Sequence, residues 1–479
     1  MARLLLLVLL SLLFSCRVVP ADEEDRPVPG RDKTGQPAML EDHSQALVHW
    51  AQLGVDRAVL VNIDAHDDLR WIDPDNIQAL KNIVRDRDWK ALKAADSAGE
   101  GGLYHPGSFI YAASRLGMIR EVYWIVPFPW FRPPVDVQRI NHFLTTYGFP
   151  QESLSTFVLT NGCYHGAFDG IPLNVCGIEQ LPDLDEPLIM SIDADFFPAM
   201  ADWYGQDLLG AMGFFFSALS QQAYRIRDTV IAHSVNGGFC DVSRRWIAET
   251  CADMMTRADL ATGPYPEIWL VKGLADIYYQ SDRPRSLLDL TGRFLDKYPL
   301  DPCLMSYRCF ALLSLGETDQ AFELARRLAV LDQAYAFTLA DLGQCLIDRG
   351  DIDTGLRFFQ AAYDYQPGMN FRQKNLGDAL FLAGRYTQAL RYYNAYRNLN
   401  GPCPVVFSMG RAALETGDEN QAARWFDQGV QCLKNEKYPP ILSAIDQEAL
   451  KIAGRFFQDR GQPDKVQFIA THPALTEPD

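Results

Sequence analysis

The first half of the chain alternates short apolar runs with longer segments of helical periodicity. The apolar runs lie near Val59, Tyr123, Phe157, Ile189 and Val230. They are rich in branched residues and lack polar alternation, which is typical of strands buried on both faces of a parallel sheet. Helix-like stretches such as 77–92 and 135–147 lie between them. The pattern predicts an α/β fold, a three-layer sandwich with a mostly parallel sheet between helices.

From about residue 265 the pattern changes to a repeat. Four glycines share one phase of it, at Gly316, Gly350, Gly384 and Gly417. Their spacing of 34, 34 and 33 residues is that of tetratricopeptide repeats, which are helix-turn-helix units. Small residues at Gly343, Gly377 and Gly410 recur inside the units, where they would let paired helices approach closely. We therefore expect an all-α tetratricopeptide-repeat solenoid over residues 265–466, with a concave face suited to a protein or peptide partner.

Metal-ligand residues follow two of the predicted strands. Asp64-Ala65-His66-Asp67-Asp68 comes after the run that ends at Val61, and Asp193-Ala194-Asp195 comes after the run that ends at Met190. Ligands of open α/β sheets bind outside the carboxyl ends of the strands, so both clusters should face one crevice. So many carboxylates would repel one another without cations. Imidazole and carboxylate ligands without thiolates favour manganese over a structural zinc ion.

Three segments, taken in order, resemble the metal motifs of the arginase/deacetylase (ureohydrolase) superfamily. They are Glu41-Asp42-His43-Ser44, the segment from Asp64 to Asp68, and Asp193-Ala194-Asp195. The resemblance covers about residues 38–242 and is closest to the divergent branch with peptide arginases, which convert arginine side chains in peptides to ornithine. It implies two Mn²⁺ ions held by six ligands: His43, Asp64, His66, Asp68, Asp193 and Asp195. Related deacetylases lack part of this set and hold one zinc ion.

The resemblance also implies a reaction. A metal-bridging hydroxide would attack the guanidinium carbon and release urea and an amine, with Asp68 both binding metal and orienting the hydroxide. The leaving amine needs a proton donor, for which His105 is the first candidate. His165 and His233 are alternatives for this role or for substrate binding, and each has an equally good structural interpretation. Asp241, in the glycine-containing loop after the run 229–233, is the candidate carboxylate for guanidinium recognition.

The N-terminus predicts export. Residues 1–21 suit a signal peptide: Arg3 supplies one positive charge before an apolar run over 4–14, which is too short to span a bilayer. Leu13-Phe14-Ser15-Cys16 resembles a lipobox, which predicts lipid attachment at Cys16, and Val19-Pro20-Ala21 offers a competing cleavage site. Residues 22–37 read as a flexible stalk. The protein is expected in the periplasm or cell envelope, with contact to the membrane only through such a lipid.

Composition sets the remaining limits. Lys and Arg number 44 against 61 Asp and Glu, and the resulting net charge of -17 argues against nucleic acid as a partner. The ten cysteines form no Cys-x-x-Cys pair, and Cys163 with Cys176 and Cys303 with Cys309 are the closest candidates for disulfides. The domains expected are the metal-dependent hydrolase over 38–262 and the repeats over 265–466, before a tail over 467–479.

Three functions remain open from the sequence. The first is an exported binuclear manganese hydrolase acting on a guanidino compound, or on an arginine-containing peptide presented by the repeats. The second is a deacylase or amidohydrolase that cleaves another C-N bond. The third is a non-catalytic scaffold of the cell envelope whose repeats bind a partner.

Overall fold

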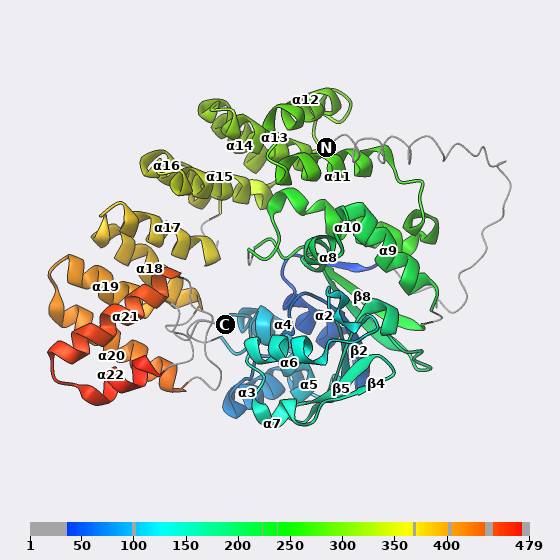
Figure 1. The fold of residues 1–479 in the computed structure, drawn as a ribbon, viewed down its shortest axis with the longest axis horizontal. Helices are drawn as coiled ribbons and strands as arrows, with labels where there is room; N and C mark the ends of the chain where they lie inside the picture. Colours follow the sequence, from blue (N-terminus) through cyan, green and yellow to red (C-terminus); the bar gives the residue numbers. More distant parts are fainter. Residues whose placement is uncertain are drawn as a thin grey trace.

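The computed structural model describes residues 36–97, 102–222, 224–236, 238–366, 370–400, 405–435 and 444–471. The expected signal peptide with Cys16, most of the stalk, and residues 472–479 of the tail lie outside these described residues. Figure 1 shows an α/β domain formed by the first half of the chain and a curved succession of helical pairs formed by the second half.

The α/β domain contains one sheet of eight strands. They are β1 (Ala38–Leu40), β2 (Ala58–Ile63), β3 (Ile119–Ile125), β4 (Val158–Thr160), β5 (Cys163–Phe168), β6 (Ile171–Cys176), β7 (Leu188–Asp193) and β8 (Ile226–Ala232). Their order is β1-β8-β7-β2-β3-β6-β5-β4. Neighbours from β1 to β6 pair in parallel, and only β5 runs antiparallel to its neighbours β6 and β4. The mostly parallel sheet predicted from the apolar runs is therefore present.

Both faces of this sheet are covered, which makes the domain a three-layer sandwich. Side chains of β2 alternate between the two cores: Val59, Val61 and Ile63 pack on one side and Leu60 on the other. The first face is covered by α8 (Phe196–Tyr204), α9 (Leu208–Ser220) and α10 (Trp246–Thr256). The second is covered by α2 (Gln45–Leu53), α3 (Pro74–Arg85), α4 (Trp89–Ala94), α5 (Phe109–Arg115) and α6 (Val137–Thr146).

The helix expected over 77–92 is two helices. Helix α3 ends at Arg85, and α4 begins at Trp89. Between them Arg87 has a φ of 55°, in the left-handed region that no helix can continue through. The side chain of Asp88 then accepts a hydrogen bond from Ala91 N–H and caps the new helix. The hydrophobic periodicity continues through both helices, but the turn at Arg87 and the cap at Asp88 divide the segment in two.

The second half consists of helical pairs with the predicted period. The helices are α11 (Glu267–Gln280), α12 (Pro284–Leu295), α13 (Pro302–Ser314), α14 (Thr318–Leu331), α15 (Ala336–Asp348), α16 (Ile352–Tyr365), α17 (Asn370–Leu382), α18 (Tyr386–Asn400), α19 (Val406–Glu415), α20 (Glu419–Asn435), α21 (Ala444–Asp459) and α22 (Pro463–Ala470). The phase-sharing residues Gly316, Gly350, Gly384 and Gly417 all have a positive φ, between 71° and 87°, in the turns between paired helices. The last helix ends at Ala470, so the array extends past the expected boundary at 466.

The small residues inside the repeats have the predicted packing role, which leads to a test. A Cβ added at Gly410 in α19 would lie 2.4 Å from Cε1 of Phe426, a fully buried ring in α20. At Gly454 in α21 the nearest atom to an added Cβ is at an ordinary 3.6 Å. Gly410→Ala should therefore destabilise the protein by about 1–3 kcal/mol, whereas Gly454→Ala should stabilise it by about 0.5–1 kcal/mol through helix propensity.

Thermal and urea denaturation of the two variants would measure this difference. Both variants replace glycine by alanine within a helix of the array. A difference between their stabilities therefore reports the contact of the added methyl group with the neighbouring helix, and not the change of residue type. Equal effects of the two substitutions would show that the close approach of α19 and α20 is not needed for stability.

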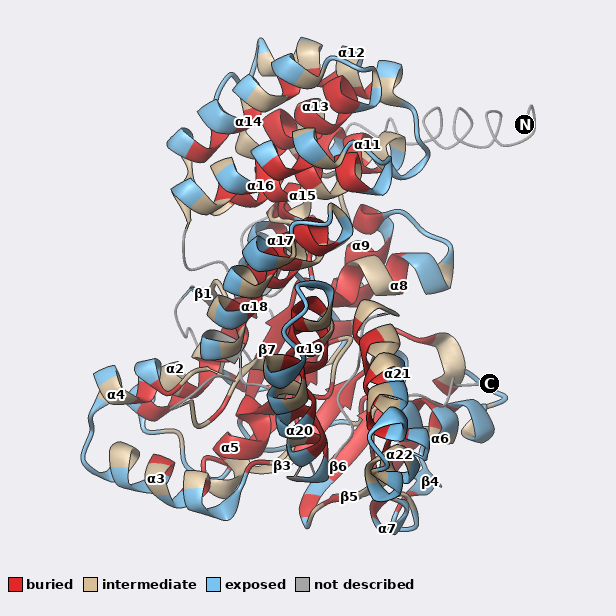
Figure 2. Ribbon diagram, turned by 90° about the vertical axis from the view of Figure 1, so that its left-hand side faces the viewer, coloured by how far each residue is buried: buried red, intermediate tan, exposed pale blue. Residues whose placement is uncertain are grey.

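The array packs directly on the α/β domain. One apolar core continues from Phe215 in α9 through Trp269 in α11 to Leu304 in α13, and Figure 2 shows buried residues on α9, α13 and α15 alike. At the junction Arg244 donates two hydrogen bonds to the carboxylate of Asp276, of 2.7 and 3.2 Å. The hydroxyl of Tyr307 donates a third, of 2.9 Å. The two parts therefore share a core and a buried ion pair.

One of the two candidate disulfides is present. Cys163 and Cys176 are bonded, with their Cα atoms 4.6 Å apart, across the antiparallel end of the sheet. The pairing of Cys303 with Cys309 is wrong, since both are free thiols. They lie six residues apart in α13, where a helix of 3.6 residues per turn directs them to different sides, and Cys303 donates to the carbonyl of Ser243 instead. Among the described residues, no helix has the length and apolar character needed to cross a membrane.

Candidate metal centre

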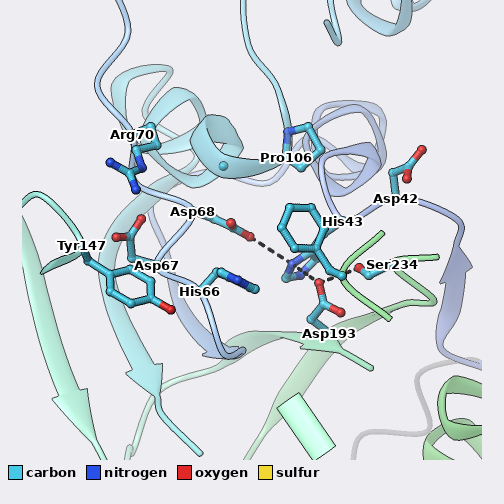
Figure 3. Close-up of a pocket in the computed structure, with 12 residues that line it drawn as sticks. Asp42, His43, His66, Asp67, Asp68, Arg70, Pro106, Tyr147, Asp193 and Ser234 are labelled. Carbon is cyan, nitrogen blue, oxygen red and sulfur yellow. Dashed lines mark hydrogen bonds and ion pairs between the residues drawn. The ribbon is translucent and has the colours of Figure 1, made fainter. Parts of the chain in front are cut away.

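The six predicted ligands come together at the carboxyl ends of three strands. His43 follows β1, the segment from Asp64 to Asp68 follows β2, and Asp193 ends β7 immediately before Asp195 at the start of α8. Strands β1, β8, β7 and β2 are consecutive in the sheet. In Figure 3, His43, Asp68 and Asp193 point toward one another across the resulting crevice, with His66 beside them. The parallel strand order thus converts separate sequence segments into one site.

The ligand atoms form two adjacent groups that share Asp64. In the first, Nδ1 of His43 lies 3.0 Å from Oδ2 of Asp64 and 3.3 Å from Oδ2 of Asp193. Asp68 Oδ2 is also close to the same nitrogen, at 3.1 Å. In the second, Nδ1 of His66 lies 2.9 Å from Oδ2 of Asp195 and 3.6 Å from Oδ1 of Asp64. Each group of three residues has the spacing required to surround one cation.

The two strand ends make the same local turn. The Oδ1 atom of Asp64 accepts a hydrogen bond of 2.8 Å from His66 N–H, and that of Asp193 accepts one of 3.0 Å from Asp195 N–H. Such Asx turns are a local property of aspartate. Asp68 then has a φ of 51°, which turns the chain sharply after its side chain. These turns direct alternate side chains into the crevice and leave one oxygen of each turn-forming aspartate facing it.

Burial makes this group of charges costly. Asp64, Asp68, Asp193 and Asp195 are all at most 6% exposed. Burial, followed by the charges of Asp193 and Asp64, raises the pKa of Asp195 to about 7. Burial and the charge of Asp64 raise the pKa of Asp68 well above its ordinary value. Asp64 differs, because burial is outweighed there by its contacts with His43 and His66, which lower its pKa. The crowding of negative charge is therefore least balanced at Asp68 and Asp195.

The unpaired atoms of the site fit a pair of divalent cations. Nδ1 of His43, Oδ2 of Asp64 and both carboxylate oxygens of Asp195 are buried and have no hydrogen-bond partner among the described residues. Buried acceptors without donors are unfavourable by about 1–3 kcal/mol each. One cation in each ligand group would give these lone pairs a partner. The donor set of imidazole nitrogen and carboxylate oxygen suits a hard ion such as Mn²⁺.

Two serines form hydrogen bonds with the predicted ligands His43 and Asp193. Ser191, two residues before Asp193 on β7, has its Oγ 2.6 Å from Nε2 of His43. When Nε2 carries the proton and donates it to Ser191, Nδ1 is free to bind metal. Ser234, after β8, donates a hydrogen bond of 2.6 Å to Oδ2 of Asp193. Both serines are buried.

Ser191→Ala should weaken metal binding. Without the hydroxyl, the orientation and tautomer of His43 are no longer set, and loss of such outer contacts typically lowers metal affinity about 10–100-fold. Isothermal titration of the metal-free protein with Mn²⁺ would measure the change. The matched control is Ser286→Ala, a half-buried serine in α12. Unchanged affinity in both variants would exclude a role for Ser191 in positioning His43.

A cavity of about 210 Å³ opens above the ligands. Besides ligand residues, its wall includes the carboxylates of Asp42 and Asp67, the guanidinium of Arg70, and the rings of Tyr147 and Phe239. Sequence reasoning had not assigned these residues. Asp42, Asp67 and Arg70 adjoin the metal motifs, a signal that could have found them. Tyr147 and Phe239 come from the end of α6 and the loop after β8, and no local pattern marks them.

The predicted proton donor does not lie on the cavity wall. Pro106 and Gly107 line the cavity but His105 does not, and its Nδ1 accepts a hydrogen bond of 3.2 Å from Gly107 N–H. Burial and the nearby charge of Arg70 lower the pKa of His105 to about 4. An imidazole with so low a pKa is neutral at pH 7, and a neutral imidazole is a poor proton donor to a leaving amine. The assignment to His105 therefore disagrees with the structure.

The alternative histidines and Asp241 are also elsewhere. His165 lies on β5, three strands from β2, and its Nδ1 is 2.6 Å from Oδ1 of Asn174. His233 bonds to the carbonyl of Arg245 at 3.2 Å, and burial followed by the charge of Arg245 lowers its pKa to about 4. The side chain of Asp241 is half exposed and lies 4.0 Å from Nη1 of Arg244. None of the three lines the cavity.

No protein-family model and no curated protein matches this chain. Solved structures with some likeness include the crystal structure of MamA protein, at 15% identity over 34% of this chain and 91% of that one, with a TM-score of 0.29. Another is PilF of Pseudomonas aeruginosa, at 16% identity over 41% of this chain and 85% of that one, also with a TM-score of 0.29. Likenesses this weak add nothing to the architecture seen directly, an eight-stranded sheet followed by tetratricopeptide-like helical pairs.

Proposed function

We propose that the α/β domain is a metal-dependent hydrolase of C-N bonds that releases urea from a guanidino group. The observation that carries the proposal is the convergence of His43, His66 and four aspartates. Among the described residues, Nδ1 of His43, Oδ2 of Asp64 and both carboxylate oxygens of Asp195 are buried there without a hydrogen-bond partner. One Mn²⁺ would be held by His43, Asp64 and Asp193, with Asp68 beside them. The other would be held by Asp64, His66 and Asp195.

The chemistry of the cavity supports this reaction class. Divalent cations bound there would supply Lewis acidity and make a water nucleophilic at neutral pH. Asp68, on the cavity wall, would take the proton that the attacking water loses and pass it to the leaving amine. A guanidinium needs carboxylates that accept its hydrogen bonds. Asp42 offers one from the cavity wall, the role that the sequence had suggested for Asp241.

We propose in addition that the array binds a protein or peptide partner, since stacked helical pairs present an extended surface. Its rigid attachment to the catalytic domain supports an arginine-containing peptide as one form of the substrate. From the character of residues 1–21 we propose that the protein works outside the cytoplasm, in the cell envelope. Cleavage of another C-N bond and a purely scaffolding role are the alternatives.

Urea release tests the proposal. The manganese-loaded full chain would be incubated with arginine, agmatine and arginine-containing peptides, and urea would be measured over time. Release by the wild type and its absence in Asp193→Asn would support guanidine hydrolysis. No release from any compound, with two equivalents of metal bound, would direct attention to a different C-N bond or to the scaffold.

A further inference from the structure

Arg70 is a cation without a partner on the wall of an acidic cavity. Within the part of the chain that the structure describes, its guanidinium makes no ion pair and no hydrogen bond. The backbone N–H of Arg70 donates a hydrogen bond of 2.8 Å to the carbonyl of Gly107. Arginine beside carboxylates normally forms paired hydrogen bonds with them. An unpaired guanidinium in such a cavity therefore needs an explanation.

The neighbours of Arg70 are engaged elsewhere. Asp67, the nearest carboxylate in Figure 3, uses its Oδ1 to accept a hydrogen bond of 2.8 Å from Leu69 N–H. Oδ2 of Asp42 accepts one of 2.9 Å from Asn236, on the far side of the metal ligands. The carboxylates of Asp64, Asp68 and Asp193 are directed at His43. The charge of Arg70 therefore acts on the nearby Asp67, but no described carboxylate lies at hydrogen-bond or ion-pair distance from the guanidinium.

Local packing keeps Arg70 at the cavity. Its stem lies against Gly107, where an added Cβ would be 3.5 Å from Cγ of Arg70 and 3.3 Å from Cε1 of His105. Pro106 and Gly107 line the cavity together with Arg70. The side chain therefore projects from a packed surface instead of an open loop, and it is available to a molecule that enters the cavity.

Arg70 and Asp42 provide a cationic and an acidic end to the cavity. Figure 3 places them on opposite sides of the metal ligands, with Arg70 beside Asp67 and Tyr147. The cavity, of about 210 Å³, has room for a small organic molecule. A ligand of this size that crosses the cavity would place a cationic group among carboxylates and an anionic group beside Arg70.

We propose that Arg70 binds a carboxylate of the substrate while the guanidino group of the same molecule lies at the metal ligands. This inference rests on the proposed guanidine hydrolysis and narrows its substrate class. The substrate is a guanidino acid, present either as a free amino acid or as the C-terminal residue of a peptide. Internal arginines and decarboxylated analogues lack the group that Arg70 recognises, so they are poor substrates.

The test compares substrates that differ only in this carboxylate. Urea release would be measured with arginine against agmatine, and with a peptide ending in arginine against its C-terminal amide. Arg70→Gln removes the charge and keeps much of the size, and Arg70→Lys keeps the charge without the paired donors. The matched control is Arg227→Gln, at an exposed arginine of β8. Melting temperature and Mn²⁺ binding would be checked for every variant.

In the wild type we expect KM to be lower for each carboxylate-bearing member of a pair. Arg70→Gln should raise KM for those members by about 10–100-fold with little change in kcat, and leave agmatine and the amide unaffected. Arg70→Lys should fall between Arg70→Gln and the wild type. The free amino acid and the C-terminal peptide residue are distinguished by which pair shows the larger kcat/KM.

Equal KM values within both pairs, or an equal loss for all four compounds in Arg70→Gln, would overturn the inference while guanidine hydrolysis stands. If no compound releases urea, the proposed reaction fails, and calorimetric binding of arginine and agmatine to the manganese-loaded protein still decides the role of Arg70. Tighter binding of arginine that disappears in Arg70→Gln would support it. Equal binding of the two would overturn it.

Discussion

Asp193→Asn is expected to abolish metal-dependent activity and leave the fold intact. Asparagine keeps the size of the side chain and an oxygen that can accept the hydrogen bond from Asp195 N–H. It removes the charge that lies 3.3 Å from His43 Nδ1 in the first ligand group. We expect urea release to fall at least about 10³-fold, a loss of ~4 kcal/mol in transition-state stabilisation. Rates and metal content, measured on the same preparation, would check this.

Stability of the variant gives a second readout. Saturating Mn²⁺ should raise the melting temperature of the wild type, because a ligand present at 100 times its dissociation constant stabilises by about 2.7 kcal/mol. The same addition should have little effect on Asp193→Asn. Without metal, the variant should be at least as stable as the wild type, since one of several crowded buried charges is gone.

Asp202→Asn, at an exposed aspartate of α8, is the matched control and should behave as the wild type. If Asp193→Asn retained two bound ions and full activity, the ligand assignment would be wrong. If it unfolded, the site would be needed for structure, as expected for a scaffold.

Asp276→Ala is expected to destabilise the whole protein by about 3–5 kcal/mol. The substitution leaves the guanidinium of Arg244, whose side chain is only 15% exposed, without its two hydrogen bonds. The buried hydroxyl of Tyr307 loses its acceptor as well. Removing one partner of a buried pair is costly because the other charge remains in a medium of low dielectric. Denaturation curves followed by circular dichroism would measure the loss.

The cooperativity of that transition is part of the prediction. Because one apolar core runs from α9 into α11 and α13, the array and the α/β domain should unfold together, at a lower denaturant concentration than in the wild type. The control is Asp289→Ala, at an exposed position of α12, which should change stability by less than about 0.5 kcal/mol.

A double substitution tests the cause of the Asp276 effect. Asp276→Leu combined with Arg244→Leu removes both charges and should restore part of the stability lost in either single variant. If the losses in free energy of unfolding were strictly additive, the two side chains would not act as a pair. If the array unfolded separately while the stability of the α/β domain was unchanged, the ion pair would not join the two parts.

Much of the fold was predictable because its signals are local. Strands β2 and β7 are buried along their whole length, so they appear in the sequence as continuous apolar runs. The glycines between paired helices recur because each turn requires a positive φ, which glycine adopts without strain. The ligands from β2 and β7 were recognisable because they lie within a few residues of a strand end, where an Asx turn directs them outward.

Other residues were predicted wrongly or missed, because their position relative to the cavity depends on contacts between distant segments. A histidine near a glycine or proline, as in His105-Pro106-Gly107, has no local feature that shows which way its ring points. His165 was separated from the site by the strand order, in which β6 and β5 turn back at the sheet edge. Tyr147 and Phe239 reach the cavity only because α6 and the loop after β8 pack beside it.

The sequence by itself determined the alternation of strands and helices, the period of the repeats, and the residues of the candidate metal centre. All three are properties of neighbouring residues, which set backbone conformation and side-chain direction over a few positions. The tertiary structure alone decided which groups meet. Ser191 contacts His43 across 148 residues, and Asn236 contacts Asp42 across 194. Arg244 joins Asp276, and Arg70 remains unpaired, because strand order and helix packing bring distant segments together, and no local pattern encodes that proximity.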